Sequence, residues 1–447
     1  MRIHFTGVKG SGMSSLAQIF KLKGHEVTGS DVTETFFTDK LLEQAGIEVL
    51  PFHHENVRQA DIVCASAAYS LAHVELQEAS RRQIPILTYP MLLGALTKEY
   101  ETILITGTHG KTTTTGLVGS LLVNAGLDPT IVVGSYIETL KNNARYGAGR
   151  QLVVEACEYK RHFLHYEGKV MVVTNIDFDH PDYFQDIQDT FNAFQECAAK
   201  LPEDGALIVC GDNLARNLQA PCRVISYGLS EENDVYAVKK GPGQFKVYVH
   251  GEHLGDMTTP LLGEHNIQNA LAMVAVGLYY NVPFSVMQRT LTGYVGVKRR
   301  LELKGQLNQH LVFDDYAHHP TEIRVTLHAV KESYPHANVV SIFQPHTYTR
   351  TKKLLSEFAQ SFQAADWVVL TDIFASEREK EKLIDISDLV EETKKHHPRV
   401  TYVPKAKLID WLEEMSRVDD DHVFLTMGAG DIYKEGEKVL EKLKMSS

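Results

Sequence analysis

A short glycine-rich segment has the residue types needed to hold a phosphate chain. The segment Gly107–Thr113 follows the apolar run Ile103–Ile105 and precedes a predicted helix. Glycines let backbone N–H groups turn towards phosphate oxygens, and the positive end of the following helix points at the same place. The Lys111 ammonium can neutralise the β and γ phosphates, and the Thr112 hydroxyl can bind Mg²⁺. The segment therefore predicts a nucleotide triphosphate site.

Each of the two glycine turns of this chain has alternatives to phosphate binding. Only two residues separate Gly107 from Gly110, whereas the usual phosphate loop has four, so a purely structural turn is one alternative. An earlier turn, Gly7–Gly12, does not have the glycine order of a dinucleotide site. It is still suited to a pyrophosphate at a helix N-terminus. A nicotinamide dinucleotide site and a plain tight turn remain the alternatives there.

Carboxylates and a histidine follow two strands that come after the phosphate loop. The run 151–154 ends in Glu155, with Glu158 three residues on, and the run 170–173 is followed by the segment ending in His180. In parallel α/β sheets, ligands gather at the carboxyl ends of strands. We therefore expect Glu155 and His180 to converge on Mg²⁺ beside the triphosphate, although a lone histidine is equally well a structural residue. Phosphoryl transfer needs such cations and positioning more than covalent help from the protein.

The elements that must position these groups alternate between strand and helix in three successive stretches. This alternation predicts parallel sheets covered by helices, so the fold class is α/β. A nucleotide-type strand–turn–helix unit begins near residue 2 and again near residue 102, and a third α/β stretch begins near residue 297. Residues 205 to 263 have many short strands and turns. We predict three domains, at residues 1–97, 98–296 and 297–447.

Composition narrows the class of protein. The formal net charge of -12 disfavours nonspecific binding to nucleic acid or to an anionic membrane, because both require a basic surface. No apolar run is long enough to span a membrane, and glycines with Lys9 interrupt the N-terminus before a signal peptide could form. The five cysteines are scattered, which fits a reducing compartment. We expect a cytoplasmic protein.

Eight segments, taken together and in order, resemble the Mur ligase family over essentially the whole chain. No single segment is specific, but the ordered set is. The segments are Gly7–Met13, Gly107–Thr113, Glu155–Glu158, Asn175–His180, His265–Ala270, Gly296–Arg300, Asp314–Glu322 and Gln344–Arg350.

The resemblance implies a fold and an activity. The expected architecture is a Rossmann-like N-terminal domain, a central phosphate-loop ATPase-like α/β domain and a Rossmann-like C-terminal α/β domain. The expected reaction uses ATP and Mg²⁺ to join UDP-N-acetylmuramate to L-alanine through an acyl phosphate, in peptidoglycan synthesis. A family relative that attaches a tripeptide to the same substrate is the alternative, and the segments 296–300 and 344–350 favour L-alanine. The resemblance implies a monomer or a homodimer.

The resemblance also assigns residues to each ligand. It places the UDP substrate on Gly10, Ser11, Gly12, Met13, Ser30, Asp31, His54, Ser66 and Ala67. It places ATP on Gly107, Thr108, His109, Gly110, Lys111, Thr112, Thr113, Asn266, Asn269, Arg300 and Asp315. Magnesium falls to Thr112, Glu155 and His180, and the amino-acid end to Tyr316, His318 and Arg350. Lys111, His180, His346 and Arg350 are the expected catalytic residues, with His318 or His346 as a base.

Two positions depart from the family pattern. Many members carry Asp where Cys157 stands, which leaves the division of metal binding between Glu155 and Glu158 open. Many carry Arg where Thr347 stands, so Arg350 becomes the better candidate for the amino-acid carboxylate. Two other classes, a nicotinamide-dependent dehydrogenase and a non-catalytic UDP-sugar sensor, leave the Gly107–Thr113 loop and its carboxylates without a role.

Overall fold

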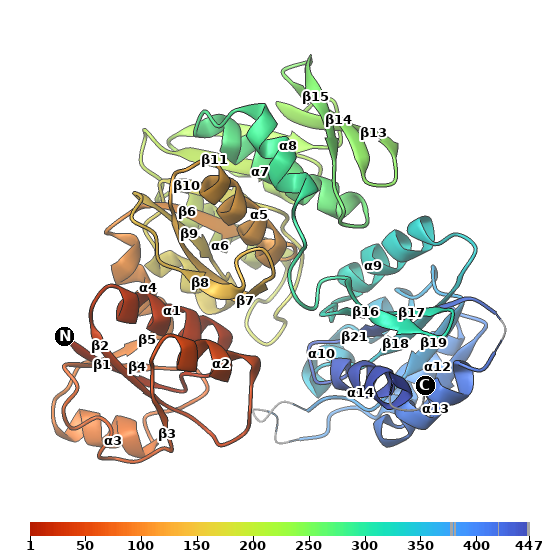
Figure 1. The fold of residues 1–447 in the computed structure, drawn as a ribbon, viewed down its shortest axis with the longest axis horizontal. Helices are drawn as coiled ribbons and strands as arrows, with labels where there is room; N and C mark the ends of the chain where they lie inside the picture. Colours follow the sequence, from red (N-terminus) through yellow and green to blue (C-terminus); the bar gives the residue numbers. More distant parts are fainter. Residues whose placement is uncertain (376–378, 380, 419, 445–447) are drawn as a thin grey trace.

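A computed structural model describes residues 1–375, 379, 381–418 and 420–444. The described chain forms three α/β domains, each built on its own parallel-rich sheet (Figure 1). The three-domain α/β architecture predicted from the sequence is thereby confirmed. The boundaries at residues 97/98 and 296/297 stay predictions, and residues 445–447 of the third domain lie outside the described part.

The first domain is a five-stranded parallel sheet with the strand order β3-β2-β1-β4-β5. Strands β1 and β4 have buried residues on both faces, as expected for a sheet with helices on each side. The elements are β1 (Arg2–Thr6), α1 (Ser11–Leu22), β2 (Glu26–Ser30), α2 (Phe37–Gln44), β3 (Val49–Leu50), β4 (Ile62–Ala65), α3 (Val74–Arg81), β5 (Ile86–Thr88) and α4 (Tyr89–Thr97).

The central domain has a ten-stranded sheet with the order β15-β14-β13-β12-β11-β10-β6-β9-β7-β8. Its middle is parallel, and antiparallel strands close both ends. The elements are β6 (Glu101–Thr106), α5 (Lys111–Asn124), β7 (Thr130–Ile137), β8 (Asn142–Arg145), β9 (Gln151–Glu155), η1 (Tyr159–His165), β10 (Val170–Val173), α6 (Ile187–Ala198), β11 (Ala206–Cys210), η2 (Leu214–Asn217), β12 (Arg223–Gly228), β13 (Val235–Gly241), β14 (Gln244–Val249), β15 (Glu252–Thr258), α7 (Glu264–Tyr279) and α8 (Phe284–Thr292).

The third domain has a six-stranded sheet with the order β16-β17-β21-β18-β19-β20, parallel except for the edge strand β16. The elements are β16 (Glu302–Leu307), β17 (His310–Asp315), α9 (Pro320–Ser333), β18 (Asn338–Phe343), α10 (Tyr348–Lys353), α11 (Leu355–Ala359), β19 (Trp367–Leu370), α12 (Ile386–Lys394), β20 (Val400–Tyr402), η3 (Lys405–Lys407), α13 (Leu408–Met415), β21 (His422–Met427) and α14 (Tyr433–Lys444).

The buried apolar clusters join the first two domains but not the third. One continuous cluster of buried residues runs from the first domain, for example Leu16 and Phe20, into one face of the central sheet, for example Leu104 and Val154. The third domain has its own separate clusters, one on each face of its sheet. The first two domains therefore share apolar packing, whereas the third domain meets them largely through polar groups.

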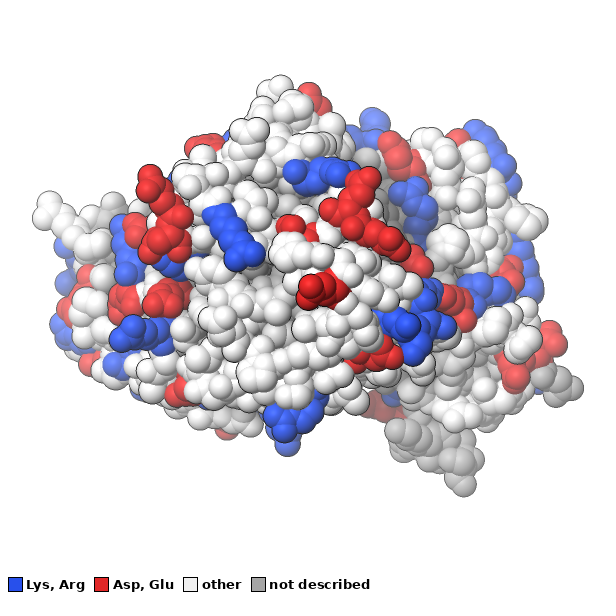
Figure 2. Space-filling model, turned by 90° about the horizontal axis from the view of Figure 1, so that it is seen from above, with Lys and Arg blue, Asp and Glu red and all other residues white. Residues whose placement is uncertain are grey.

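The surface carries charges of both signs. Figure 2 shows Lys and Arg interspersed with Asp and Glu on the face seen from above, with no large area of one sign. Among the described helices, none combines the length and the apolar character that crossing a membrane requires.

Candidate active site at the meeting of three domains

The phosphate loop joins β6 to α5 and depends on two glycines with left-handed backbone angles. Gly107 has φ 131° and Gly110 has φ 81°. A Cβ on Gly107 would lie 1.9 Å from the Thr174 hydroxyl oxygen, and a Cβ on Gly110 would lie 2.8 Å from the Asn269 side-chain oxygen. The loop is therefore wedged between the end of β10 and helix α7, and glycine is required at both positions.

Lys111, the first residue of α5, turns back into this loop. Its ammonium donates to the carbonyls of Gly107 (2.5 Å) and Thr108 (3.0 Å) and to the carboxylate of Glu158 (2.9 Å). Burial lowers the pKa of Lys111, but the Glu158 carboxylate outweighs this and raises it overall. Lys111 is thus a fixed positive charge at the site where phosphates are expected.

The predicted metal residues Thr112 and Glu155 lie together. The Thr112 hydroxyl donates to one Glu155 carboxylate oxygen at 3.0 Å, and the Gly134 N–H donates to the other at 3.0 Å. A hydroxyl and a carboxylate at the head of a phosphate loop are oxygen ligands of the kind that Mg²⁺ prefers. This pair fits the expected ion.

His180, which has a left-handed φ of 54°, lies near the Glu158 oxygen that Lys111 does not contact. Its Nε2 is 3.6 Å from a Glu158 oxygen, and its ring packs on Tyr159 with centroids 4.6 Å apart. That same Glu158 oxygen is buried and has no hydrogen-bond partner. Burial raises the pKa of Glu158, while Lys111 and His180 outweigh this and lower it overall. Glu158 therefore presents an unsatisfied anionic oxygen between Lys111 and His180, which also fits a cation.

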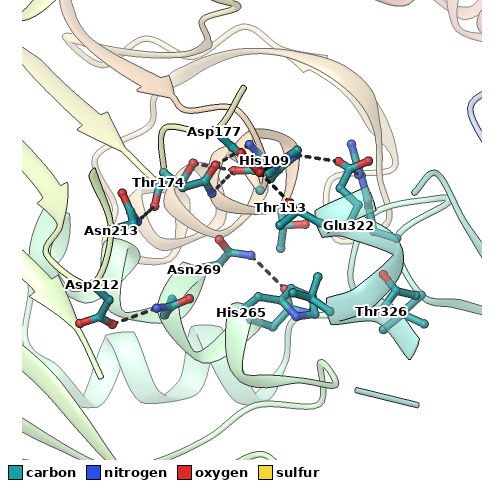
Figure 3. Close-up of a pocket in the computed structure, with 18 of the residues that line it drawn as sticks. His109, Thr113, Thr174, Asp177, Asp212, Asn213, His265, Asn269, Glu322 and Thr326 are labelled. Carbon is teal, nitrogen blue, oxygen red and sulfur yellow. Dashed lines mark hydrogen bonds and ion pairs between the residues drawn. The ribbon is translucent and has the colours of Figure 1, made fainter. Parts of the chain in front are cut away.

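A second cluster of ionisable groups joins the central domain to the third. His109 lies 3.3 Å from Asp177 and 3.3 Å from Glu322 of α9, and Figure 3 shows it between them. Burial lowers the pKa of His109, but its hydrogen bonds to Asp177 and Glu322 outweigh this and raise it to about 9. The Thr321 hydroxyl also donates to Asp177 at 2.7 Å. His109 is therefore a cation shared between two domains.

In the part of the chain that the structure describes, His109, Asp177 and His319 are the group of three whose ligand atoms lie close enough to share an ion. The ring nitrogens of His319 are already used, since Nε2 donates to the Phe178 carbonyl and Nδ1 accepts from the Thr321 N–H. With His109 protonated as well, this cluster is a domain contact. It does not include the predicted ligands Glu155 and His180.

Beside this contact lies a cavity of about 400 Å³ between α7 and α9 (Figure 3). Among its walls are the predicted nucleotide residues His109, Gly110, Thr113, Asn266, Asn269, Arg300 and Asp315. The structure thus brings these seven positions together from two domains. Asn266 and Asn269 are mutually fixed by a 3.0 Å hydrogen bond. Asp315 is held by the N–H groups of Leu301 and Ala317, and burial raises its pKa to about 6.

A larger cavity of about 800 Å³ brings all three domains to one place. Its lining includes Ala68 of the first domain, His180 of the central domain, and the predicted residues Tyr316, His318, His346 and Arg350 of the third domain. The grouping of the four third-domain residues agrees with the resemblance, and their role at the amino-acid end stays a prediction.

Two groups in this cavity have environments that the sequence did not reveal. Arg350 is buried and donates two hydrogen bonds, of 3.2 and 2.9 Å, to Asp179. The Nδ1 of His346 is buried without a hydrogen-bond partner, and its ring stacks on Phe374 at 5.6 Å. Burial lowers the pKa of His346 to about 3, so its imidazole is neutral.

The first glycine turn is built as the sequence suggested, with Gly10 immediately before α1. Asp31 accepts from the Lys9 N–H at 2.7 Å, which closes the turn. A Cβ on Gly12 would lie 3.0 Å from the Tyr89 ring, and one on Gly7 would lie 2.8 Å from Ser66, so both glycines face close neighbours.

The predicted substrate residues of the first domain do not all face outward. Ser30 is fully buried and its hydroxyl donates to Glu75 at 2.6 Å. Glu75 also accepts from the Thr6 hydroxyl at 2.7 Å. The Ser30 hydroxyl is therefore turned into the domain. His54 and Ala67 are exposed, and Ser66 follows the end of β4.

Sequence reasoning missed Asp177, Asp179, Glu322 and Glu75 as partners of the predicted residues. The nearest signal was the presence of Asp177 and Asp179 in the segment before His180, but their partners are distant in the chain. His109 and Glu322 are separated by 213 residues, and Arg350 and Asp179 by 171.

Comparisons with known proteins agree with this geometry. Family profiles match along the chain: "Mur ligase family, catalytic domain" at residues 2–101, "Mur ligase middle domain" at 105–277 and "Mur ligase, glutamate ligase domain" at 299–430. A UDP-N-acetylmuramate–L-alanine ligase of Desulfitobacterium hafniense is 45% identical over 98% of this chain and 99% of its own. One of Caldanaerobacter subterraneus subsp. tengcongensis is 39% identical over 99% of this chain and 98% of its own.

Solved structures show the same fold. The UDP-N-acetylmuramate-alanine ligase of Thermotoga maritima superposes with a TM-score of 0.84 at 25% identity, with 100% of both chains covered. A murein peptide ligase of Psychrobacter arcticus superposes with a TM-score of 0.73 at 22% identity, covering 99% of this chain and 98% of its own, which bears on the fold alone. The matches span the phosphate loop, the carboxylates that follow it and the third domain, and the chain belongs to the Mur ligase family.

Proposed function

We propose that this enzyme uses ATP to join the carboxylate of UDP-N-acetylmuramate to the amine of L-alanine, in peptidoglycan synthesis. The observation that carries the proposal is the phosphate loop, in which Lys111 contacts Glu158 and Thr112 contacts Glu155. His109, Gly110 and Thr113 of the same loop line the nucleotide cavity. His180, 3.6 Å from Glu158, lines the cavity to which three domains contribute. The 45% and 39% identical relatives, each named for this activity, support the choice of substrates. The use of ATP makes the cytoplasm the expected location.

The ATP phosphates would bind the loop Gly107–Thr113, with the base between Asn266, Asn269 and Arg300. Thr112 and Glu155 would hold Mg²⁺, and His180 with the unsatisfied oxygen of Glu158 would hold a second cation. When bound, Mg²⁺ neutralises phosphate charge and so favours nucleophilic attack on phosphorus. The packing of Glu158 between Lys111 and His180 supports a shared role for Glu155 and Glu158 in this region.

The reaction is a balanced pair of transfers. A carboxylate oxygen of UDP-N-acetylmuramate attacks the γ phosphorus, the bond to the β–γ bridging oxygen breaks, and ADP leaves with an acyl phosphate as the other product. Lys111, held by two carbonyls, stabilises the developing charge on the transferring group. The neutral amine of L-alanine then attacks the acyl carbon. The amine loses a proton and inorganic phosphate departs, leaving an amide.

The amino-acid end would lie in the larger cavity, among Tyr316, His318, His346 and Arg350. Arg350 is the candidate partner of the L-alanine carboxylate, and binding there competes with its bonds to Asp179. His318 and His346 are both candidate bases. The low pKa of His346 suits a hydrogen-bond acceptor for the L-alanine ammonium better than a strong base.

The UDP substrate would bind the first-domain turn, with its pyrophosphate at Gly10, Ser11, Gly12 and Met13 and with Asp31, His54, Ser66 and Ala67 around it. Gly10 comes directly before α1, and a helix N-terminus favours an anion. Because the Ser30 hydroxyl points inward, the contribution of Ser30 would come from its backbone or from fixing the turn. The oligomeric state, a monomer or a homodimer, stays a prediction.

A competition experiment tests the choice of amine. The purified enzyme is given ATP, Mg²⁺ and UDP-N-acetylmuramate with equal concentrations of L-alanine and of the tripeptide that family relatives attach, and the products are identified by mass. We expect the alanyl product to dominate. A predominant tripeptide product would replace the proposed substrate with the alternative. Some product from glycine or L-serine is expected in separate reactions, because one methyl group distinguishes substrates by only about 1–3 kcal/mol.

A further inference from the structure

Helix α1 carries a row of polar residues on the face that points towards the central domain. Ser11, Ser14, Ser15 and Gln18 recur at intervals of three and four residues, so they share one side of the helix. Ser14, Ser15 and Gln18 are almost completely buried. The helix packs against β7 and β8 of the central domain, and Figure 1 shows it beside them. Buried polar groups are costly unless they are paired, so their partners define a specific interface.

Asn143 of β8 is the partner at the centre of that interface. Its side-chain amide donates to the Ser11 carbonyl and to the Ser14 hydroxyl, both at 2.9 Å, and its side-chain oxygen accepts from Gln18 at 2.9 Å. Its backbone carbonyl accepts from the Ser15 hydroxyl. Asn143 is fully buried. One side chain therefore uses both of its amide N–H donors and its oxygen on the first two turns of α1.

The same contact continues towards the expected metal site. The Ser15 hydroxyl also donates to the Val133 carbonyl of β7 at 3.2 Å. The next residue, Gly134, donates its N–H to Glu155, and Glu155 accepts from Thr112. Hydrogen bonds to strand β7 therefore connect helix α1 with the Glu155 carboxylate beside the phosphate loop.

The remaining packing favours a fixed relation between these two domains. Their buried apolar residues form one continuous cluster, whereas the third domain has separate cores. Apolar contacts are non-directional and tolerate sliding, but the hydrogen bonds of Asn143 have one satisfactory register. The first two domains are therefore joined by a shared core and by the hydrogen bonds of Asn143, and the third domain takes part in neither.

We propose that Asn143 is a positioning residue that sets the distance between the carboxylate of the UDP substrate and the γ phosphate of ATP. This inference rests on the proposed function, since it requires one nucleotide on each side of the α1–β8 contact. The two substrates bind to different domains, so their approach is fixed by the interface and not by either site alone. A misplacement of about 1 Å can reduce the rate of such a reaction 10²-fold.

The test compares kcat, KM and nucleotide affinity in three variants. Asn143→Ala removes the three side-chain bonds, and Ser15→Ala removes the hydroxyl contacts with Asn143 and Val133 while leaving the amide in place. Asn308→Ala is the control in the third domain, where it removes one hydrogen bond of an exposed asparagine to the Ser416 carbonyl. Both interface variants should lower kcat, Asn143→Ala at least 10-fold, with KM for ATP and for UDP-N-acetylmuramate within about threefold of the wild type. The control should lower only the melting temperature.

Three results decide the proposal. An unchanged kcat in Asn143→Ala and Ser15→Ala, whatever their loss of melting temperature, would overturn it. So would a loss confined to the affinity for the UDP substrate. If the wild type itself makes no alanyl product, the proposed function fails, and the inference is then judged by distances between spin labels on α3 and α6. A broader distance distribution in Asn143→Ala upholds a fixed interface, and an unchanged one refutes it.

Discussion

Individual side chains show how far residue types alone can predict a site. The contacts of Thr112 with Glu155 and the position of Lys111 follow from one strand–turn–helix unit and a neighbouring strand, so their local pattern was sufficient. The partners of Arg350 and His109 were not predictable, because they are set by how the third domain docks. Ser30 faces inward because Glu75, 45 residues later, accepts a hydrogen bond from its hydroxyl.

At this scale, replacing Lys111 with alanine should lower turnover by at least 10²–10³, about 3–4 kcal/mol, the typical cost of deleting an electrostatic stabiliser. It also leaves Glu158 buried without its cation, so the melting temperature should fall as well. Steady-state turnover and thermal unfolding measure the two effects.

Two further variants separate the effect on turnover from the effect on stability. Lys111→Ala combined with Glu158→Gln should recover stability without recovering turnover. Lys331→Ala, which removes a more exposed ion pair with Asp366 in the third domain, should leave turnover unchanged. Near-normal turnover in Lys111→Ala would remove this loop from the mechanism.

The elements were the most predictable level, because hydrophobic periodicity and glycine turns are local signals. The strand β6, the loop and helix α5 appear where the sequence placed them, and the stretch 205–263 forms β11 to β15 as short strands. The order of the strands was not predictable. β9 comes to lie between β6 and β7, and β10 on the other side of β6, through crossovers that depend on long-range packing.

The loop geometry predicts unequal effects of alanine at two glycines with positive φ. Gly107→Ala should be strongly destabilising, since its Cβ would meet the Thr174 hydroxyl at 1.9 Å and backbone N–H groups at 3.0 and 3.1 Å. Gly126 also has a positive φ, of 76°, but a Cβ there would meet no atom within 4 Å, so Gly126→Ala should cost only about 1–2 kcal/mol. Urea unfolding of the two variants measures the difference, and equal midpoints would show that the loop is not wedged as described.

At the scale of the whole molecule, the third domain is docked through polar contacts that can be remade. His109 with Glu322, Thr321 with Asp177, and Arg350 with Asp179 all cross from the central domain to the third. No sequence pattern predicted this set, because each pair unites residues from different domains. Closure of the third domain over the substrates would exclude the water that hydrolyses an acyl phosphate.

This docking predicts a pH dependence of stability. The pKa of His109 in the folded protein, about 9, lies above its unfolded value of about 6.5, because Asp177 and Glu322 stabilise the imidazolium. Asp179 also raises this pKa, and the neutral ring of His319 packs beside His109. Protonated His109 therefore stabilises the folded state fully below pH 6.5, and this stabilisation is lost as the pH rises through 9. The loss should be on the order of 3 kcal/mol.

The comparison with His109→Gln isolates that contribution. The free energies of unfolding of the wild type and the variant should differ most near pH 6 and converge above pH 9. Curves that run parallel over this range would show that His109 is not a shared cation.

The most direct test of the proposed activity is phosphate release from ATP and Mg²⁺, measured with both UDP-N-acetylmuramate and L-alanine, with each alone, and with neither. We predict sustained release only when both are present, with one new amide formed for each phosphate. Release that is independent of L-alanine, or no release with both substrates, would contradict an ATP-driven ligase that uses these two substrates.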